Sequence, residues 1–211
     1  MAAIREELVD AALERSLVLM DNKVYSDIHK QYEFRQETIL ADKSLTEAEK
    51  SEAIRTINKS YDRDKILFNS GTKRVCEDCN NECLATLYCE ICIRNYLISN
   101  FSNWTSGNDD IDRLIQKCQM ETFEPTRVIE WIPYDDLLNI KYLTKGGCSE
   151  IYTASWIDGC YFEWDSKGQE LIRQFEFEEQ SVVLKRLENI ENANQNLLDK
   201  VCNLKYIFKR K

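Results

Sequence analysis

Five cysteines lie within seventeen residues near the middle of the chain, and their spacing indicates metal binding. Two residues separate Cys76 from Cys79, and two residues separate Cys89 from Cys92. Each pair can place two sulfur atoms on one ion, so two pairs complete the tetrahedron of four thiolates that zinc prefers. An iron–sulfur site needs the same ligands, and a set of thiols without metal is the third interpretation. We expect a structural zinc ion, because four protein ligands leave no open position for water.

The gap between the two cysteine pairs bears on the kind of zinc site. Nine residues separate Cys79 from Cys89, fewer than the roughly 15–20 of the common four-cysteine spacing. A gap of this length suits a small zinc ribbon or knuckle. Cys83 lies inside the gap without a partner at the two-residue spacing, so we rank it fifth. The sequence leaves open whether Cys83 replaces one of the four ligands.

A glycine turn near residue 146 introduces a second group of residues suited to chemistry. Gly146 and Gly147 separate two strand-like runs, residues 140–144 and 151–156. A further β-rich run covers residues 181–187 and contains a lysine. These patterns predict an antiparallel sheet with a glycine turn at one end.

The lysine of the third run is Lys185, and its position suits a contact with phosphate. Side chains alternate along a strand, so Val183 and Lys185 are expected on the same face. The competing interpretation is a lysine at the edge of a sheet that faces water.

Residues 1 to about 70 are expected to be helical because their apolar residues recur at helical spacing. Thr46 and Glu49 fit a capping box, and a helical hairpin should turn near residues 42–44. His29 has no cysteine or second histidine nearby, so we expect a lone surface histidine. The surface of these helices is either an ordinary helical layer or a docking surface. The residues expected on the buried stripe are Leu8, Ala11, Ala12, Leu17, Val18, Ile54, Ile57, Tyr61, Leu67 and Phe68.

The remaining patterns divide the chain into four segments. Residues 93–118 are expected to be helical with a break at 105–108, and residues 194–204 also follow helical spacing. Pro125 and Pro133 mark a connection. The expected segments are a helical region at 1–72, a cysteine-rich segment with following helices at 73–118, a connector at 119–136 and a strand-rich unit at 137–211.

Composition and charge exclude several classes of function. The 211 residues carry a net charge of −9 and are 43% apolar. An acidic chain lacks the basic surface that non-specific binding to nucleic acid or acidic lipid needs. No apolar run approaches the roughly 20 residues of a membrane-spanning helix, and acidic residues interrupt the N-terminal apolar runs. We therefore expect an intracellular protein with reduced cysteines, placed in the cytoplasm with the nucleus left open.

Several short motifs give the chain a resemblance to a known family over residues 39–204. The motifs are Asp42-Lys43-Ser44-Leu45-Thr46, the cysteine cluster, Asn103-Trp104-Thr105-Ser106-Gly107-Asn108, Ile129-Glu130-Trp131-Ile132, Gly146-Gly147, Trp156-Ile157-Asp158-Gly159 and Val183-Leu184-Lys185. In these the chain resembles protein kinases, and more closely a large family of kinase-like proteins expanded in fungi. The resemblance implies an α+β fold: N-terminal helices, a small zinc-ribbon-like element with four cysteines, and a partial protein-kinase N-lobe of antiparallel sheet plus one helix.

The resemblance also implies roles for individual residues. In a kinase the glycine-rich loop covers the phosphates of ATP, which is bound with magnesium, and the strand lysine pairs with the α- and β-phosphates. In this chain the loop would be residues 144–151 and the lysine Lys185. The nucleotide-binding residues implied in this way are Leu143, Gly146, Gly147, Ile151, Val183 and Lys185.

The chain also departs from the kinase pattern. Thr144 and Ser149 stand where two loop glycines are usual, and Lys200 aligns with the glutamate that orients the strand lysine. No His-Arg-Asp or Asp-Phe-Gly triplet occurs in the 211 residues. We therefore expect a kinase-like protein that lacks the catalytic lobe, is inactive alone, binds ATP weakly and acts as a regulatory or interaction protein on an unidentified protein partner. The alternatives are a fragment of an active Ser/Thr or Tyr kinase from an incomplete gene model, and a zinc-stabilised protein-interaction module.

Overall fold

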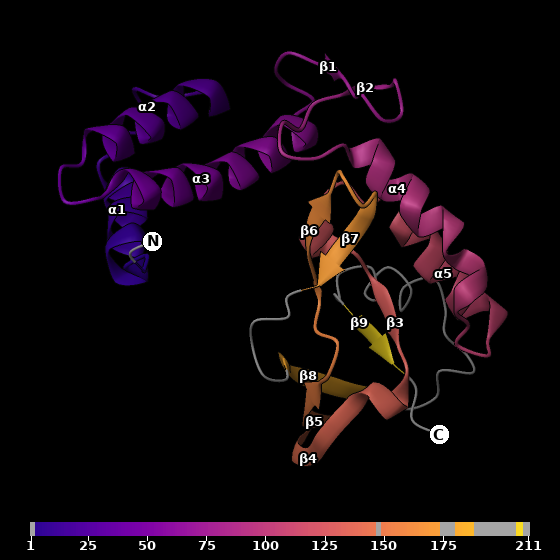
Figure 1. Cartoon of the computed structure of the whole chain (residues 1–211). Coiled ribbons are helices and arrows are strands. Elements are labelled where there is room, and N and C mark those ends of the chain that lie inside the picture. Colours follow the sequence, from indigo (N-terminus) through magenta and orange to yellow (C-terminus); the bar gives the residue numbers. More distant parts are fainter. Residues whose placement is uncertain (1–2, 147–148, 174–179, 188–205, 209–211) are drawn as a thin grey trace. The chain divides into compact units, whose positions relative to one another are not determined.

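The computed structural model describes residues 3–146, 149–173, 180–187 and 206–208 (Figure 1). The fold is α+β, with helices and several small sheets. The chain divides into two compact units, Met1–Cys89 and Glu90–Lys211, and each is described by itself. The four segments expected from the sequence stay a prediction about domains.

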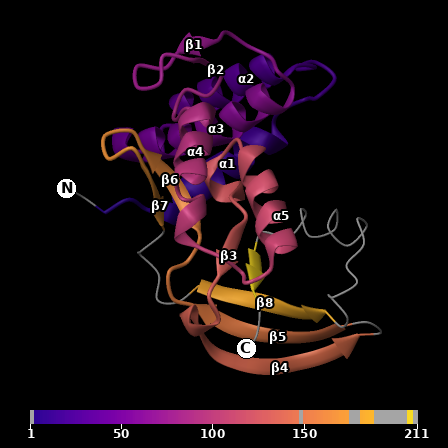
Figure 2. The same cartoon turned by 90° about the vertical axis from the view of Figure 1, so that its right-hand side faces the viewer.

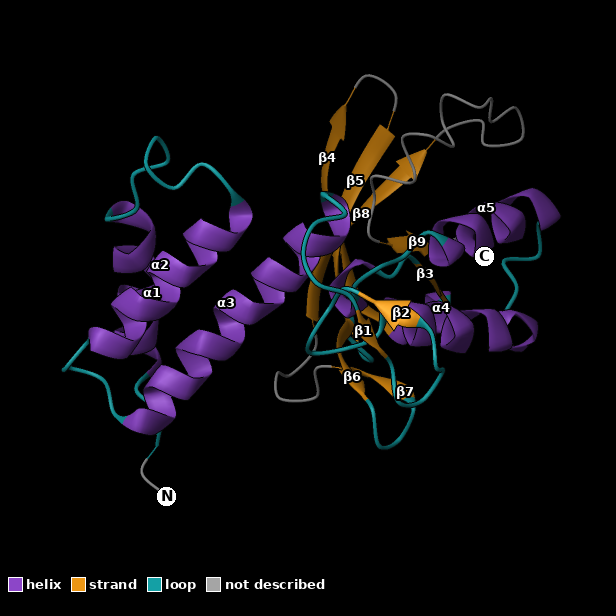
Figure 3. Ribbon diagram, turned by 90° about the horizontal axis from the view of Figure 1, so that it is seen from above, coloured by secondary structure: helices purple, strands orange, loops and turns teal. Residues whose placement is uncertain are grey.

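Three helices form most of the first unit, and they pack on one another in pairs (Figures 1 and 3). They are α1 (Glu6–Val18), α2 (Ile28–Ala41) and α3 (Glu47–Leu67). The turn between α2 and α3 falls at the expected residues 42–44. Their shared core consists of Val9, Ala12, Ile39, Leu45, Ala53 and Ile57.

The expected capping box starts α3. Thr46 Oγ1 accepts a hydrogen bond from the backbone N–H of Glu49, and the Glu49 carboxylate accepts one from the N–H of Thr46 at 2.8 Å. Arg5 also donates to this carboxylate at 2.7 Å, so α3 is tied to the residue that precedes α1. The hydrogen bond from Arg5 holds the pKa of Glu49 well below its usual range.

Two expectations for this unit are wrong. The residues at the ends of the expected stripe, Leu17, Val18, Leu67 and Phe68, are exposed, because they lie in or just after the last turns of α1 and α3. His29 is half-buried: Nδ1 lies 2.6 Å from the Tyr61 hydroxyl and Nε2 lies 2.9 Å from Ser70 Oγ. His29 therefore ties the start of α2 to the end of α3.

The second unit begins with two helices and the break that the sequence predicted. They are α4 (Glu90–Ser99) and α5 (Asp109–Met120), with the short η1 (Phe101–Asn103) after α4. Asn108 caps α5 by accepting from the N–H groups of Asp110 and Ile111. Asp112 reaches back to accept from the Ser106 N–H at 2.8 Å. The Asn103–Asn108 motif thus forms the turn that starts α5.

Strands follow the two helices in the described residues of the second unit (Figure 2). The sheet of β4 (Leu137–Gly146), β5 (Ser149–Trp156) and β8 (Gln180–Leu187) is antiparallel in that order, as the glycine-turn pattern predicted. An antiparallel hairpin joins β6 (Tyr161–Asp165) and β7 (Glu170–Arg173), and β3 (Glu130–Ile132) pairs in parallel with β9 (Tyr206–Phe208). The short η2 (Pro125–Arg127) and η3 (Tyr134–Asp136) flank β3.

One face of the three-stranded sheet carries the core of the unit. The buried residues are Ile132, Leu137, Ala154, Trp156 and Leu184. Residues 119–136, expected as a connector, supply β3 and part of this core. The helix expected over 194–204, with Lys200, lies outside the described residues.

Candidate metal centre

A tight turn presents the first cysteine pair. The short strands β1 (Arg74–Val75) and β2 (Glu82–Cys83) pair antiparallel and flank the turn that holds Cys76 and Cys79. The Cys76 N–H donates to the Asn81 carbonyl, and the Asn80 N–H donates to the Cys76 carbonyl, both at 2.9 Å. Asn80 adopts a φ of 55°, a left-handed conformation that asparagine tolerates better than most residues. The chain therefore reverses directly after Cys79.

The start of α4 presents the second pair. Cys89 directly precedes α4, and Cys92 lies in its first turn. Residues three apart lie on the same side of a helix, so both thiols can approach one ion. The unpaired N–H groups of a helix start favour negative charge and therefore thiolates.

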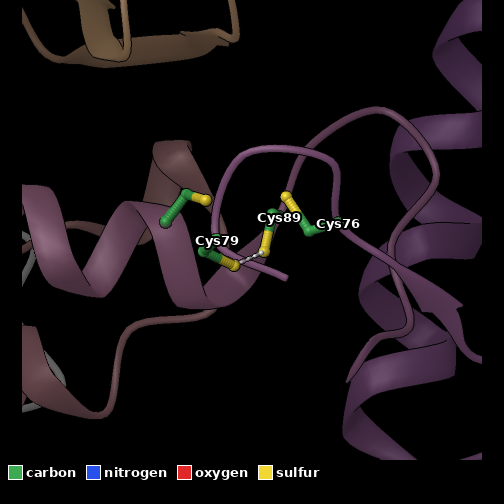
Figure 4. A group of neighbouring side chains, drawn as sticks. Cys76, Cys79 and Cys89 are labelled. Atoms are coloured by element: carbon green, nitrogen blue, oxygen red, sulfur yellow. Dashed lines mark hydrogen bonds between the residues drawn. The ribbon is translucent and has the colours of Figure 1, made fainter. Parts of the chain in front are cut away.

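All four sulfur atoms lie within 4.8 Å of one another. Cys79 Sγ and Cys89 Sγ are 3.7 Å apart and turn toward each other in Figure 4, with Cys76 beside them. A regular tetrahedron with Zn–S bonds of about 2.3 Å has edges of about 3.8 Å. The four cysteines are thus close enough to hold a metal ion, and their number and type are consistent with zinc.

Asp62 of α3 positions the loop that precedes Cys89. Its side chain is 0% exposed and accepts from Thr86 Oγ1 and from the Leu87 N–H, each at 2.8 Å. Lys65 completes the network with an ion pair to Asp62 at 2.8 Å. The sequence does not reveal the burial of Asp62 and Lys65, because opposite charges three residues apart on a helix usually lie on a solvated surface.

Arg74 holds the same loop from the other side. Its Nε donates to the Ala85 carbonyl at 2.7 Å and its Nη2 donates to the Tyr88 carbonyl at 2.6 Å. Because Arg74 lies two residues before Cys76, these bonds link the two halves of the cysteine cluster. No motif in the sequence pointed to Arg74.

Cys83 is buried beside the four predicted ligands. Its side chain is 1% exposed. Its sulfur, the sulfur of Cys89 and a carboxylate oxygen of Glu90 lie within 4.8 Å of one another. Cys83 therefore lies close to Cys89, which is one of the four predicted ligands.

The described residues that were expected to bind nucleotide lie on the three-stranded sheet, and Ile151, Val183 and Lys185 share the face opposite its core. Ile151 pairs with Lys185 and Thr153 pairs with Val183 across β5 and β8. Val183 is 69% exposed and Leu143, at a register shift in β4, is 58% exposed. Gly146 pairs with Ser149 at the end of the hairpin, and Gly147 lies outside the described residues. Their binding of nucleotide stays a prediction.

The second unit contains a buried carboxyl group, that of Glu130, which no sequence pattern predicted. Arg173 at the end of β7 donates to the Glu130 carboxylate of β3 at 2.5 Å. Burial raises the pKa of Glu130 to about 7, against the opposing charge of Arg173. The Arg173 guanidinium lies 4.0 Å from the ring of Tyr161, whose pKa burial raises to about 12. These contacts link β3 to the β6–β7 hairpin.

No family model, curated protein or solved structure matches this chain. Within the part of the chain that the structure describes, none of the helices combines the length and the apolar character that crossing a bilayer requires.

Proposed function

We propose that Cys76, Cys79, Cys89 and Cys92 bind one structural zinc ion, and that the zinc-stabilised protein acts by binding a protein partner. The observation that supports this most directly is the gathering of four thiols whose sulfur atoms lie within 4.8 Å of one another, close enough to hold a metal ion. Four thiolates fill the coordination of the ion, so no position is left for a catalytic water. Zinc in this site would supply folding free energy.

The surroundings of the cluster support a stabilising role for the ion. The strands β1 and β2 have two residues each, too few for an independently stable hairpin. The loop between them and α4 is held by a few hydrogen bonds from Asp62 and Arg74. A metal that joins four points of such a segment would add to the few contacts that hold it.

The proposed mode of action is regulation or interaction in a kinase-like protein. Phosphoryl transfer needs an aspartate near the acceptor hydroxyl and side chains that hold magnesium. The printed sequence has neither the His-Arg-Asp nor the Asp-Phe-Gly triplet that carries them. We therefore propose that these 211 residues act by binding and do not catalyse phosphoryl transfer.

The test compares the partners recovered in cells by proximity labelling with four versions of the full chain. The wild-type protein and Lys185→Met should label the same partner, because the zinc module supports the interaction. The double variant Cys76→Ser/Cys89→Ser should lose that partner, while Cys160→Ser, a cysteine outside the cluster, should keep it. An unchanged partner set for the double variant would contradict the proposal.

The second candidate function is ATP binding on the exposed face of the β4-β5-β8 sheet. The register supports it: Lys185 lies opposite Ile151, and Val183 shares the exposed face with Lys185. The test is whether MgATP raises the unfolding temperature of the full chain. Sequencing the native transcript past codon 211 tests the related alternative that the chain is part of an active kinase.

A further inference from the structure

The cysteine cluster contains more metal-binding groups than one zinc ion uses. Cys83, Cys89 and Glu90 form a second group of donors whose ligand atoms lie within 4.8 Å of one another. All three residues are buried, with exposed fractions of 1%, 3% and 7%. Cys89 belongs to this group and to the group of four thiols.

We propose that Cys83 and Glu90 form a second metal position beside the first, with the thiolate of Cys89 bridging the two ions. This inference rests on the proposed zinc at the first position. A thiolate sulfur has several lone pairs and can bind two thiophilic cations at once. The ligand class is a thiophilic divalent cation, such as Zn²⁺ or Cd²⁺.

The distances are compatible with a shared ion. Two sulfurs on one zinc lie about 3.8 Å apart, and a sulfur and a carboxylate oxygen about 3.5 Å apart, given bonds of roughly 2.3 and 2.1 Å. The observed limit of 4.8 Å for Cys83, Cys89 and Glu90 is about 1 Å longer than these values. The sulfur and oxygen atoms would therefore have to approach one another when an ion binds.

The charge of the cluster also supports a second cation. Four thiolates around one divalent ion leave an excess of negative charge, and the Glu90 carboxylate is buried close to it. Buried charge is costly unless an opposite charge accompanies it. A second divalent ion adds two positive charges to this acidic group of ligands.

The two positions should fill in order. The first position offers four thiolates, whereas the second offers one thiolate of its own, one carboxylate and a share of Cys89. Fewer thiolate ligands hold a soft ion less tightly. The first equivalent of metal therefore occupies the first position and the second equivalent occupies the second.

The experiment is a titration of the metal-free full chain with ¹¹³Cd²⁺ under reducing conditions, followed by native mass spectrometry and ¹¹³Cd NMR. The wild-type chain should bind two ions and give two resonances that split each other, because scalar coupling passes through a shared sulfur. Cys83→Ala and Glu90→Gln should each bind one ion and give one unsplit resonance. The control Cys160→Ala removes a thiol outside both groups and should still bind two.

Each departure from this pattern has a distinct meaning. One ion bound by the wild-type chain would overturn the second position and leave the proposed zinc site standing. No bound ion would overturn both. Two resonances without mutual splitting would overturn the shared sulfur. Two ions bound by both variants would overturn Cys83 and Glu90 as the ligands of the second position. Glu90→Gln keeps the shape of the side chain, so it provides the test if Cys83→Ala does not fold.

Discussion

The cysteine cluster and the three-stranded sheet both gather residues that the sequence marked as suited to chemistry, but they do so by different routes. The cluster is assembled within seventeen residues by a tight turn and the first turn of α4. The sheet joins Ile151 to Lys185, 34 positions apart, through the register of β5 and β8. Three of the four predicted metal ligands are buried, whereas Leu143, Val183 and Lys185 are exposed.

This difference determines what each region can be expected to do. The number, type and spacing of the clustered thiols match the ligand set of a structural zinc ion, so the cluster points to a metal. An exposed lysine on a sheet face satisfies its charge in water whether or not a phosphate is present. The cluster is therefore the stronger candidate site, and four changes test that ranking.

Removal of a zinc ligand should have the largest effect. Apparent binding free energies of structural zinc are about 10–16 kcal/mol, as large as the whole stability of a typical domain. We expect Cys76→Ser to lose the bound zinc and to lose amide protection over residues 74–92. Native mass spectrometry and hydrogen exchange measure the two effects. Cys160→Ser should change neither the zinc content nor the amide protection. Equal zinc content in the two variants would show that Cys76 is not a zinc ligand.

Removal of the buried anchor of the cluster should have the next largest effect. Asp62→Ala leaves Lys65 buried without its carboxylate and removes the acceptor of Thr86 and Leu87. Breaking a buried pair costs about 3–5 kcal/mol, which urea unfolding can measure.

Asp64→Ala is the matched control for Asp62→Ala on the same helix. Asp64 pairs with Arg63, and both side chains are about one third exposed, at 32% and 37%. A pair exposed to this extent contributes about 0–1 kcal/mol. Similar losses in the two variants would show that Asp62 does not support the cluster.

The pH dependence of Glu130 provides a prediction for the second unit. Its pKa in the folded protein is about 7, above the ordinary value of 4.5, so the folded state binds the proton more tightly. The contribution of Glu130 to the free energy of unfolding is fully present below about pH 4.5. It amounts to about 3 kcal/mol and is lost as the pH rises through 7. Glu130→Gln should not show this loss of stability. The difference between the wild-type and variant curves of unfolding free energy against pH therefore isolates the contribution of Glu130 from that of other groups. Parallel curves for both proteins between pH 5 and 8 would contradict the assignment.

Replacement of Lys185 should have the smallest effect. If MgATP binds the exposed face, a tenfold loss of affinity in Lys185→Met reduces the ATP-dependent stabilisation by about 1.4 kcal/mol. Lys141 is the control, because it pairs with Thr153 and so points to the same exposed face. Thermal unfolding with and without MgATP measures both variants. Equal shifts in wild type and Lys185→Met would show that Lys185 does not contribute to nucleotide binding, and the absence of a shift in all three proteins would leave the sheet without a nucleotide role.

The sequence predicted the parts of the fold that depend on local patterns. The capping box at Thr46, the break before α5 and the hairpin around Gly146 follow from residues close together in the chain. The two cysteine pairs belong to the same class, because two-residue spacing itself places sulfurs together.

The parts that sequence patterns missed depend on distant contacts. Asp62 and Glu130 resemble solvated acids in the sequence, yet both are buried against residues 24 and 43 positions away. The position of Cys83 beside Glu90 follows from how the loop returns to α4, which no spacing rule describes. Burial of a charged group is a property of the assembled unit and is not visible in a short motif.

The central claim is that four cysteines hold one zinc ion, and X-ray absorption at the zinc edge tests it most directly. The full chain, purified under reducing conditions and loaded with one equivalent of zinc, should show four sulfur ligands at about 2.3 Å. Cys160→Ser should give the same spectrum, and Cys76→Ser should not. Nitrogen or oxygen ligands around the ion in the wild-type chain, or no retained zinc, would contradict the account.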